Sequence, residues 1–346
     1  MPFVSVIIPC RNEEEFIAAC LDSIASQDYP KEEMDVMIVD GMSEDKTREI
    51  AEEKSSRYPF IRVLSNKNKF TPFGLNIGVK AARGEVIVRM DAHARYEKDY
   101  ISKCVEHLTE SKADNVGGVI KTLPKENTPM AQAIAYCLSS FFGAGGSYFR
   151  TGSESPRWVD TVFGGCYKKE VFEKIGLFDE RLIRSQDIEF NRRLVRAGGK
   201  ILLVPEIISY YYPQSTFKKF LRHNFSDGIW TILPLKYGVK IFSRRHLLPL
   251  IFVSGLLFLL LFSLASKFFF FLLLLTIILY LSASFLFSLK IVLEERKIKP
   301  LFYLPLAFAN RHFGYGAGSL FALFQIRSLL KPLFRQFVKK QNYWKE

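Results

Sequence analysis

Cysteine is scarce in this 346-residue sequence, and the five cysteine residues are widely spaced. They are Cys10, Cys20, Cys104, Cys137 and Cys166. The number is odd and no Cys-x-x-Cys pair occurs, which argues against a disulfide framework. The pattern indicates reduced cytosolic thiols.

Glycine-rich phosphate loops are also missing. Neither Gly-x-Gly-x-x-Gly nor Gly-x-x-x-x-Gly-Lys-Ser/Thr occurs, so a dinucleotide cofactor and a P-loop are not expected. The first residues lack a basic stretch followed by an apolar core, so a signal peptide is not expected either.

A long apolar run lies towards the carboxyl end. Residues 247–289 form an almost continuous run of apolar side chains, whereas the first 240 residues resemble a soluble domain. This asymmetry indicates a membrane protein with a large extramembrane domain. The net charge of +13 suits contact with an anionic leaflet or phosphorylated substrates. Nucleic acid is not an expected partner, because the basic residues are scattered and concentrate near the apolar segments.

Short apolar strands alternate with helices through the first 90 residues. Strands are expected at 4–9, 36–40, 61–65 and 86–90, which predicts an α/β fold with a doubly wound parallel sheet. The first helix should follow Cys10, use Asn12 as its N-cap and end near residue 27. The glycine-rich stretch 141–152 is expected to be a mobile loop or a plain linker.

Acidic residues follow these strands. Asp40 could accept a hydrogen bond from a nucleotide base, or it could cap a turn. Asp91 and His93 could face one divalent cation, or they could be a solvated strand end. Asp187 begins a helix, where it could be a catalytic base across the crevice from that cation or a partner of the helix dipole.

Five motifs in order resemble those of the inverting glycosyltransferases of family 2. They are V-I-I-P-x-x-N-E at 6–13, V-D-G-x-S-x-D-x-T at 39–47, D-x-H at 91–93, G-G-C at 164–166 and F-D-E…Q-D at 178–187. The resemblance covers about residues 3–230 and is nearest to the membrane-anchored glucosyltransferases of succinoglycan-type exopolysaccharide assembly. It implies a Rossmann-like, nucleotide-sugar-binding domain of the GT-A type.

The resemblance also implies roles for individual residues. Those expected at the nucleotide sugar are Pro9, Arg11, Glu13, Asp40, Asn76 and Asp91. Asp91 and His93 would hold Mn²⁺ or Mg²⁺ on the diphosphate, and Asp187 would be the general base. Many members have Asp-x-Asp where this chain has Asp-Ala-His, and Glu-Asp where it has Gln186-Asp187.

The acceptor is expected to meet a further set of residues. They are Gly164, Gly165, Cys166, Gln186, Arg222, His223 and Trp230. The paired glycines would let a substrate approach the backbone closely. Processive synthases of the family have Gln-x-x-Arg-Trp near residues 221–230, and its absence here favours one sugar per encounter.

Four regions are expected along the chain. They are a cytosolic glycosyltransferase domain (1–213), amphipathic interfacial helices (214–245), a transmembrane helical hairpin (246–290), and an interfacial or re-entrant segment with a basic tail (291–346). Basic residues flank the hairpin, which places both of its ends in the cytoplasm. The helix near 217–225 could lie on the membrane or pack in a core. Arg311 and His312 could meet a lipid diphosphate or extend to the headgroups.

The expected activity is metal-dependent transfer of a sugar, with inversion, from a nucleotide-sugar donor to a lipid-linked saccharide. The expected donor is a UDP-sugar. The alternative is a polyprenyl-phosphate sugar synthase, whose acceptor phosphate needs no base. A non-catalytic nucleotide-sugar-binding membrane protein and a transporter are further alternatives, although two or three spans leave little room for a transport path. The sequence does not indicate an oligomeric state.

Overall fold

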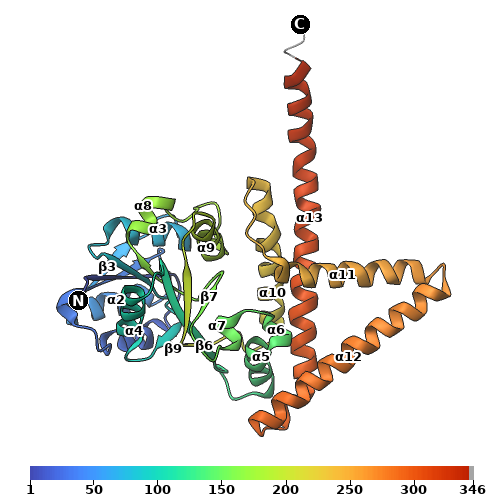
Figure 1. The fold of residues 1–346 in the computed structure, drawn as a ribbon, viewed down its shortest axis with the longest axis horizontal. Coiled ribbons are helices and arrows are strands. Elements are labelled where there is room, and N and C mark those ends of the chain that lie inside the picture. The colour runs from blue at the N-terminus through green and yellow to red at the C-terminus, as the bar shows by residue number, and fades with distance from the viewer. Residues whose placement is uncertain (343–346) are drawn as a thin grey trace. The chain divides into compact units, whose positions relative to one another are not determined.

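The computed structural model describes residues 1–342, with side chains as far as residue 325, and its chain forms two compact units (Figure 1). The first unit comprises Met1–Leu123 and Leu138–Pro213, and the second comprises Pro124–Cys137 and the chain from Gln214 onward. Residues 124–137, inside the expected 1–213 domain, therefore group with the second unit. The side chains of the basic tail beyond residue 325 lie outside the described residues.

Nine strands in the described chain form one mixed sheet. They are β1 (Val4–Cys10), β2 (Met34–Asp40), β3 (Ile61–Ser65), β4 (Val86–Arg89), β5 (Ala94–Tyr96), β6 (Asn115–Thr122), β7 (Arg157–Val159), β8 (Cys166–Lys168) and β9 (Ile201–Tyr211). The order is β3-β2-β1-β4-β8-β6-β9-β5, with β7 paired to β9. The first four strands are parallel, but β8 is antiparallel to β4 and β6. The α/β class is confirmed, and a purely parallel sheet is wrong.

Helices cover both faces of the sheet (Figure 1). One face carries α1 (Ile17–Ala25), α2 (Thr47–Arg57) and α4 (Tyr100–Glu110), and the other carries α3 (Thr71–Ala81), α8 (Glu170–Ile175) and α9 (Gln186–Arg196). Alternation along β1 shows why: Val6 and Ile8 enter one core and Ile7 enters the other. With both faces covered, a ligand can reach the sheet at the ends of its strands.

The segment after β1 is not the expected start of a helix. Asn12 has φ of +55°, and α1 begins only at Ile17 with Phe16 as its N-cap. Asn12 instead accepts a hydrogen bond from the backbone N–H of Glu44, and its own N–H donates to Ser43 Oγ. These cross-links explain the difference, because backbone groups that a helix would have paired are satisfied by a second loop.

Strand β9 has no counterpart among the expected strands. It pairs in parallel with β6, and the register shifts between Gly117 and Val119. A Cβ on Gly118 would lie 1.8 Å from the carbonyl oxygen of Ile207, so only glycine fits there. The shift allows β9 to continue past Pro205, which cannot donate to the ladder.

The stretch 141–152 is more ordered than a mobile loop. It forms two short helices, α6 (Phe141–Ala144) and α7 (Tyr148–Thr151), separated by Gly145 and Gly146. Ser140 caps α6 by accepting a hydrogen bond from Gly143 N–H. The glycines therefore end helices, as Gly145 and Gly152 do with positive φ.

The second unit is helical. Its elements are α5 (Pro129–Ser139, shared with the first unit), α10 (Phe217–Ile232), α11 (Arg244–Ser263), α12 (Lys267–Glu295), α13 (Leu304–Asn342) and the 3₁₀ turns η2 (Leu233–Tyr237) and η3 (Lys299–Phe302); the first unit adds η1 (Lys31–Glu33). Helices α10 and α13 approach each other closely at glycines. A Cβ on Gly228 would lie 2.0 Å from Tyr315 O, and one on Gly318 would lie 2.0 Å from Phe225 O. The buried face of α10 therefore packs on α13.

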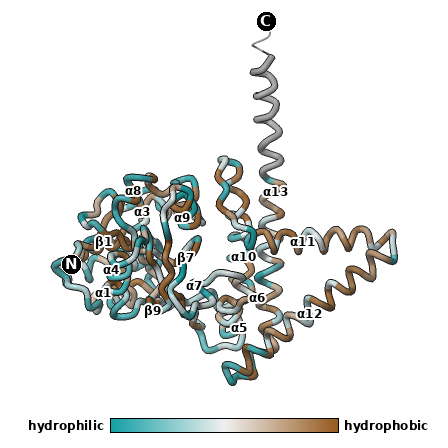
Figure 2. The backbone as a smooth tube through the Cα atoms, in the orientation of Figure 1, coloured by the Kyte–Doolittle hydropathy of each residue, from teal (hydrophilic) through white to brown (hydrophobic). Residues whose placement is uncertain are grey.

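Helices α11 and α12 are candidate membrane spans. At 20 and 29 residues, each is long enough to cross a hydrocarbon core of ~30 Å. Figure 2 shows both as largely apolar. Their side chains are exposed, with Leu257 51% and Leu279 61% accessible, whereas the core helix of a soluble protein would be buried. The apolar surface is therefore suited to lipid.

The interfacial or re-entrant placement of the segment after α12 stays a prediction. Helix α13 runs without a break from Leu304, although Asn310, Arg311 and His312 lie within it. Asn224 Nδ2 donates to Asn310 Oδ1 (3.0 Å), and Arg311 Nη1 donates to Asn224 Oδ1 (2.6 Å). Because α10 satisfies Asn310 and Arg311, and Tyr280 OH on α12 lies 3.0 Å from His312 Nδ1, these polar residues are accommodated within the helix.

Candidate functional site

A pocket of about 290 Å³ opens in the first unit at the carboxyl ends of β1 and β4. Ligands of α/β sheets commonly bind at this edge. Predicted residues that line it are Pro9, Arg11, Glu13, Asp91, His93 and Gln186. Cys10, Asn66, Lys69, Arg89 and Arg184 also line it, and the sequence analysis did not single them out for this site. The pocket is therefore polar and carries several cationic side chains.

Asp91 is held by a buried arginine. Arg89 Nη2 donates to Asp91 Oδ1 at 3.0 Å, and the two side chains are 8% and 12% exposed. Burial raises the pKa of the Asp91 carboxyl, but the charges of Arg89 and His93 and the hydrogen bond from Arg89 together outweigh burial, and the pKa is lowered. Asp91 is therefore a carboxylate at neutral pH.

His93 pairs with Glu13 across the pocket. His93 Nδ1 lies 3.2 Å from Glu13 Oε1. Burial lowers the pKa of His93, but the hydrogen bond to Glu13 and the charge of Asp91 more than offset burial and raise it. Glu13 therefore contacts the predicted metal ligand directly, which the sequence analysis did not anticipate.

The donor set can be compared with what a divalent ion needs. Among the described residues, no group of three or more His, Cys, Asp and Glu side chains is arranged to hold a metal. Asp91 and His93 offer one carboxylate and one imidazole. Magnesium in nucleotide enzymes is typically bound by one or two carboxylates, with substrate phosphates and water completing the shell. The residues fit an ion brought in with a diphosphate better than a permanent protein cage.

Asp187 lies in the first turn of α9, beside the pocket-lining Gln186. Its Oδ2 is 3.7 Å from Arg89 Nη1, and its side chain is 32% exposed. Ser185, the preceding N-cap, has φ of +60°, an uncommon conformation that turns the chain into the helix here. The carboxylate is therefore accessible and lies beside the same arginine as Asp91.

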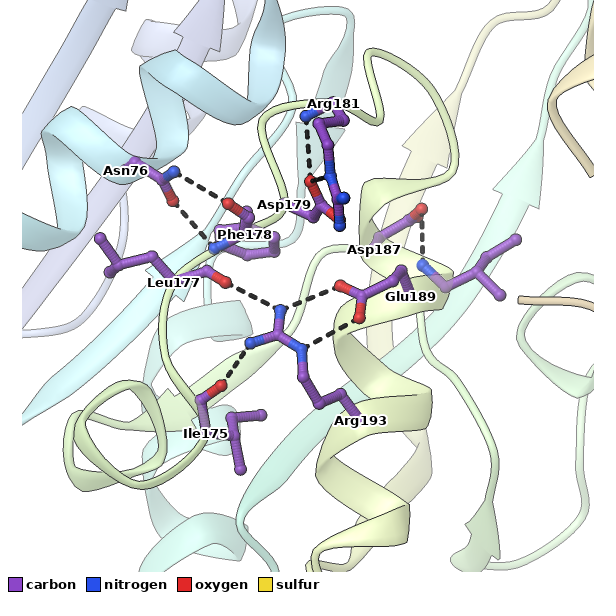
Figure 3. Close-up of polar contacts among 10 residues, drawn as sticks. Asn76, Ile175, Leu177, Phe178, Asp179, Arg181, Asp187, Glu189 and Arg193 are labelled. Atoms are coloured by element: carbon purple, nitrogen blue, oxygen red, sulfur yellow. Dashed lines mark hydrogen bonds and ion pairs between the residues drawn. The ribbon is translucent and has the colours of Figure 1, made fainter. Parts of the chain in front are cut away.

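Two side chains fasten the loop that leads to Asp187 (Figure 3). Asn76 on α3 donates to Phe178 O (3.0 Å) and accepts from Phe178 N–H (2.9 Å). Arg193 on α9 donates to the carbonyls of Ile175 and Leu177 and pairs with Glu189. Asn76 is 3% exposed and its amide anchors the loop, and a role for Asn76 at the nucleotide stays a prediction.

Asp40 is buried at the end of β2. Its carboxylate accepts a hydrogen bond from Ser43 N–H (3.2 Å) and lies 3.6 Å from Arg48 Nη1. With a side chain only 1% exposed, Asp40 matches the turn-capping alternative.

The Gly164-Gly165-Cys166 stretch packs against Arg89. Gly165 O accepts from Arg89 N–H (2.9 Å), and a Cβ on Gly164 would lie 2.8 Å from Arg89 O. Both glycines have positive φ, so this packing gives a structural reason for the pair. Cys166 is fully buried in β8, and an acceptor role for it stays a prediction.

The remaining acceptor candidates belong to the second unit. Arg222, His223 and Trp230 lie on α10, and His223 Nε2 is 3.4 Å from Asp227 Oδ2. The first unit contributes Gln186, which lines the pocket. An acceptor role for the α10 residues stays a prediction.

Arg89 is the main residue that the sequence analysis missed. It lies two positions before Asp91, and side chains two apart on a strand point to the same face. The two-residue spacing of Arg89 and Asp91 can be read from the sequence. Its significance depends on Asp187, almost 100 positions away, which only the fold brings near.

Comparison with known proteins gives concordant similarities. The profile described as Glycosyl transferase family 2 matches residues 5–176. The chain is 35% identical over 268 residues to the dolichyl N-acetyl-α-D-glucosaminyl phosphate 3-β-D-2,3-diacetamido-2,3-dideoxy-β-D-glucuronosyltransferase of Methanococcus voltae, covering 75% of this chain and 81% of that protein. It is 29% identical to succinoglycan biosynthesis protein ExoA of Rhizobium meliloti, covering 66% and 74%.

A solved structure shares the fold. It is the mannosyltransferase of Pyrobaculum calidifontis in complex with GDP-Man and Mn²⁺, with a TM-score of 0.61 and 18% identity, over 92% of this chain and 87% of that chain. The expected GT-A-type fold is thereby confirmed.

Proposed function

Because this chain belongs to glycosyl transferase family 2 and is a glycosyltransferase, we propose that it transfers a sugar, with inversion, from a nucleotide-sugar donor to a lipid-linked saccharide. One observation carries the proposal: Asp91, His93 and Glu13 line a single pocket with Arg89, and Asp187 lies beside Arg89. This arrangement provides a diphosphate site and a base in one place.

The donor is a nucleotide sugar, with UDP-sugar as our choice. The Pyrobaculum calidifontis neighbour binds GDP-Man with Mn²⁺, so the shared fold does not determine which nucleobase the donor carries. Pro9 and Arg11 lie at the end of β1 and line the pocket, where a nucleoside can meet them. Lys69 and Arg89 add positive charge that favours a diphosphate.

Asp91 and His93 would hold Mn²⁺ or Mg²⁺ against the diphosphate. A divalent ion there supplies Lewis-acid stabilisation of the negative charge on the leaving phosphate. Glu13 orients His93 through its contact with Nδ1, in the way that carboxylates commonly orient metal-binding histidines.

Asp187 acts as general base for the acceptor hydroxyl. Its exposed carboxylate takes the proton as the oxygen attacks the anomeric carbon from the side opposite the leaving group. The loop contacts of Asn76 and Arg193 hold α9 so that this carboxylate keeps its place. Inversion follows from a single displacement.

The acceptor is lipid-linked and is met at the cytoplasmic face. The Methanococcus voltae relative is named for a dolichyl phosphate-linked sugar, which supports an acceptor of this class. The two candidate spans have basic residues at their outer flanks, which favours a cytoplasmic catalytic unit and a multi-pass chain. The residues that we propose for the acceptor are Gly164, Gly165, Cys166 and Gln186 in the first unit and, separately, Arg222, His223 and Trp230 in the second.

Release of nucleoside diphosphate by the full chain in lipid nanodiscs tests the proposal. A panel of nucleotide sugars is assayed with Mn²⁺, with Mg²⁺ and with chelator, together with a lipid extract as acceptor source. We expect metal-dependent release from one donor and its loss in Asp91→Ala. Absence of release from every donor would instead support a non-catalytic nucleotide-sugar-binding protein.

A further inference from the structure

Arg89 lies between two carboxylates that have different proposed jobs. Its Nη2 is 3.0 Å from Asp91 Oδ1, and its Nη1 is 3.7 Å from Asp187 Oδ2. The side chain is 8% exposed and its backbone N–H is fixed by Gly165 O. A single buried cation therefore stands beside both the predicted metal ligand and the predicted base.

The guanidinium is incompletely satisfied. Within the described residues, Nε and Nη1 of Arg89 have no hydrogen-bond acceptor, although both atoms are buried. Buried donors without acceptors are costly, and those that persist in a native structure call for a functional explanation. For comparison, Arg62 makes a two-pronged pair with Asp35 through Nε and Nη2 at 2.9 and 2.8 Å. The incomplete pairing is thus a property of the site.

We propose that Arg89 is a positioning residue and a resident counter-ion, which occupies Asp91 until a divalent cation displaces it towards Asp187. This inference rests on the proposed function, because it assumes a metal at Asp91. Two cations beside one buried carboxylate repel each other strongly, so a divalent ion at Asp91 competes with the guanidinium for it. The gap of 3.7 Å to Asp187 leaves the guanidinium a second carboxylate to pair with.

The exchange couples the two halves of the reaction. Without metal, Arg89 balances the charge of Asp91, so the empty pocket does not hold an unpaired buried carboxylate. With metal at Asp91, the guanidinium pairs more closely with Asp187 and orients it for the acceptor. The base is then fully in place only when the donor site is loaded.

Mn²⁺ binding to the full chain in nanodiscs, with UDP or GDP present to supply the diphosphate, tests this inference without any assay of turnover. Arg89→Gln should bind Mn²⁺ at least about tenfold more tightly than the wild type, because the competing charge is gone. The variant should have a lower Tm in chelator, and saturating Mn²⁺ should raise its Tm by more than that of the wild type. Arg62→Gln, which removes an arginine of a pair outside the pocket, should leave the Mn²⁺-induced gain unchanged.

The outcomes separate this inference from the proposed function. Equal or weaker Mn²⁺ binding by Arg89→Gln, with binding lost in Asp91→Asn, overturns the counter-ion role and leaves the metal site standing. Absence of Mn²⁺ binding in all proteins, with either UDP or GDP present, overturns both this inference and the proposed metal dependence. If Arg89→Gln does not fold, NMR of the arginine side-chain ¹⁵N signals in the wild type takes the place of the binding measurement on that variant. The Nε–Hε signal of Arg89, assigned by its loss in Arg89→Lys, should shift on adding Mg²⁺, and an unmoved signal would contradict the exchange.

Discussion

At the scale of single residues, Asp187 distinguishes between the two candidate acceptors. A hydroxyl acceptor must lose a proton during attack, whereas a lipid phosphate is already anionic. The side chain is partly exposed and lies beside Arg89, so a neutral isostere should remove the base while keeping its size and shape. The chemistry of the acceptor can therefore be determined from one substitution.

We expect Asp187→Asn to reduce turnover by about 10²–10⁴-fold, with the KM for the donor nearly unchanged. Steady-state kinetics with a saturating lipid acceptor measures this. Glu173→Gln, which changes an exposed carboxylate on α8, is the matched control and should retain full activity. An Asp187→Asn enzyme that kept most of its rate would favour the polyprenyl-phosphate sugar synthase.

At the scale of elements, the approach of α10 to α13 depends on glycine. Gly228 and Gly318 each leave room for a backbone carbonyl of the opposite helix. Ser319 Oγ donates to Gly228 O (3.1 Å), and Asn224 bonds to Asn310. Small residues and interhelical hydrogen bonds are how helices associate where there is little hydrophobic driving force between them.

Gly228→Ala should destabilise the second unit by about 1–3 kcal/mol, because its Cβ would overlap the Tyr315 carbonyl and force the helices apart. Thermal unfolding in detergent, followed by size-exclusion chromatography, measures the loss. Gly255→Ala on α11 is the control, since its Cβ would meet nothing within 4 Å. Equal stability of the two variants would show that the close approach contributes little.

At the scale of the whole molecule, buried thiols limit stability at alkaline pH. Burial raises the pKa of Cys10 to about 12, with smaller contributions from Asp40, Glu13 and Asp45, and burial also raises the pKa of Cys137 to about 12. Both thiols stay protonated in the folded chain while those of the unfolded chain ionise near pH 9. Ionisation therefore favours the unfolded state between about pH 9 and 12.

We expect the free energy of unfolding to fall with rising pH above 9, by ~1.4 kcal/mol per pH unit for each such thiol. Denaturant midpoints at pH 7.5, 9 and 10 measure the slope. Cys10→Ala and Cys137→Ala should each flatten it. Slopes identical to the wild type would assign the alkaline loss to other groups.

Local pattern was enough to predict much of this protein. The apolar runs placed β1 to β4 and the candidate spans, because burial and periodicity are set by neighbouring residues. The motifs also indicated the glycosyltransferase family and the GT-A fold. They singled out Asp91 and His93, which the fold places in one pocket, and Asp187, which lies beside the same arginine.

Only the tertiary structure decided how those residues are used. Arg89 stands between Asp91 and Asp187 because β4 ends beside the start of α9, a contact between segments almost 100 positions apart. The same long-range packing gives Asn76 its loop-anchoring contacts and buries Cys166. It also pairs β9 with β6 across the bulge at Gly118. Sequence periodicity describes the face on which a side chain lies, but the partner it meets depends on which elements pack together.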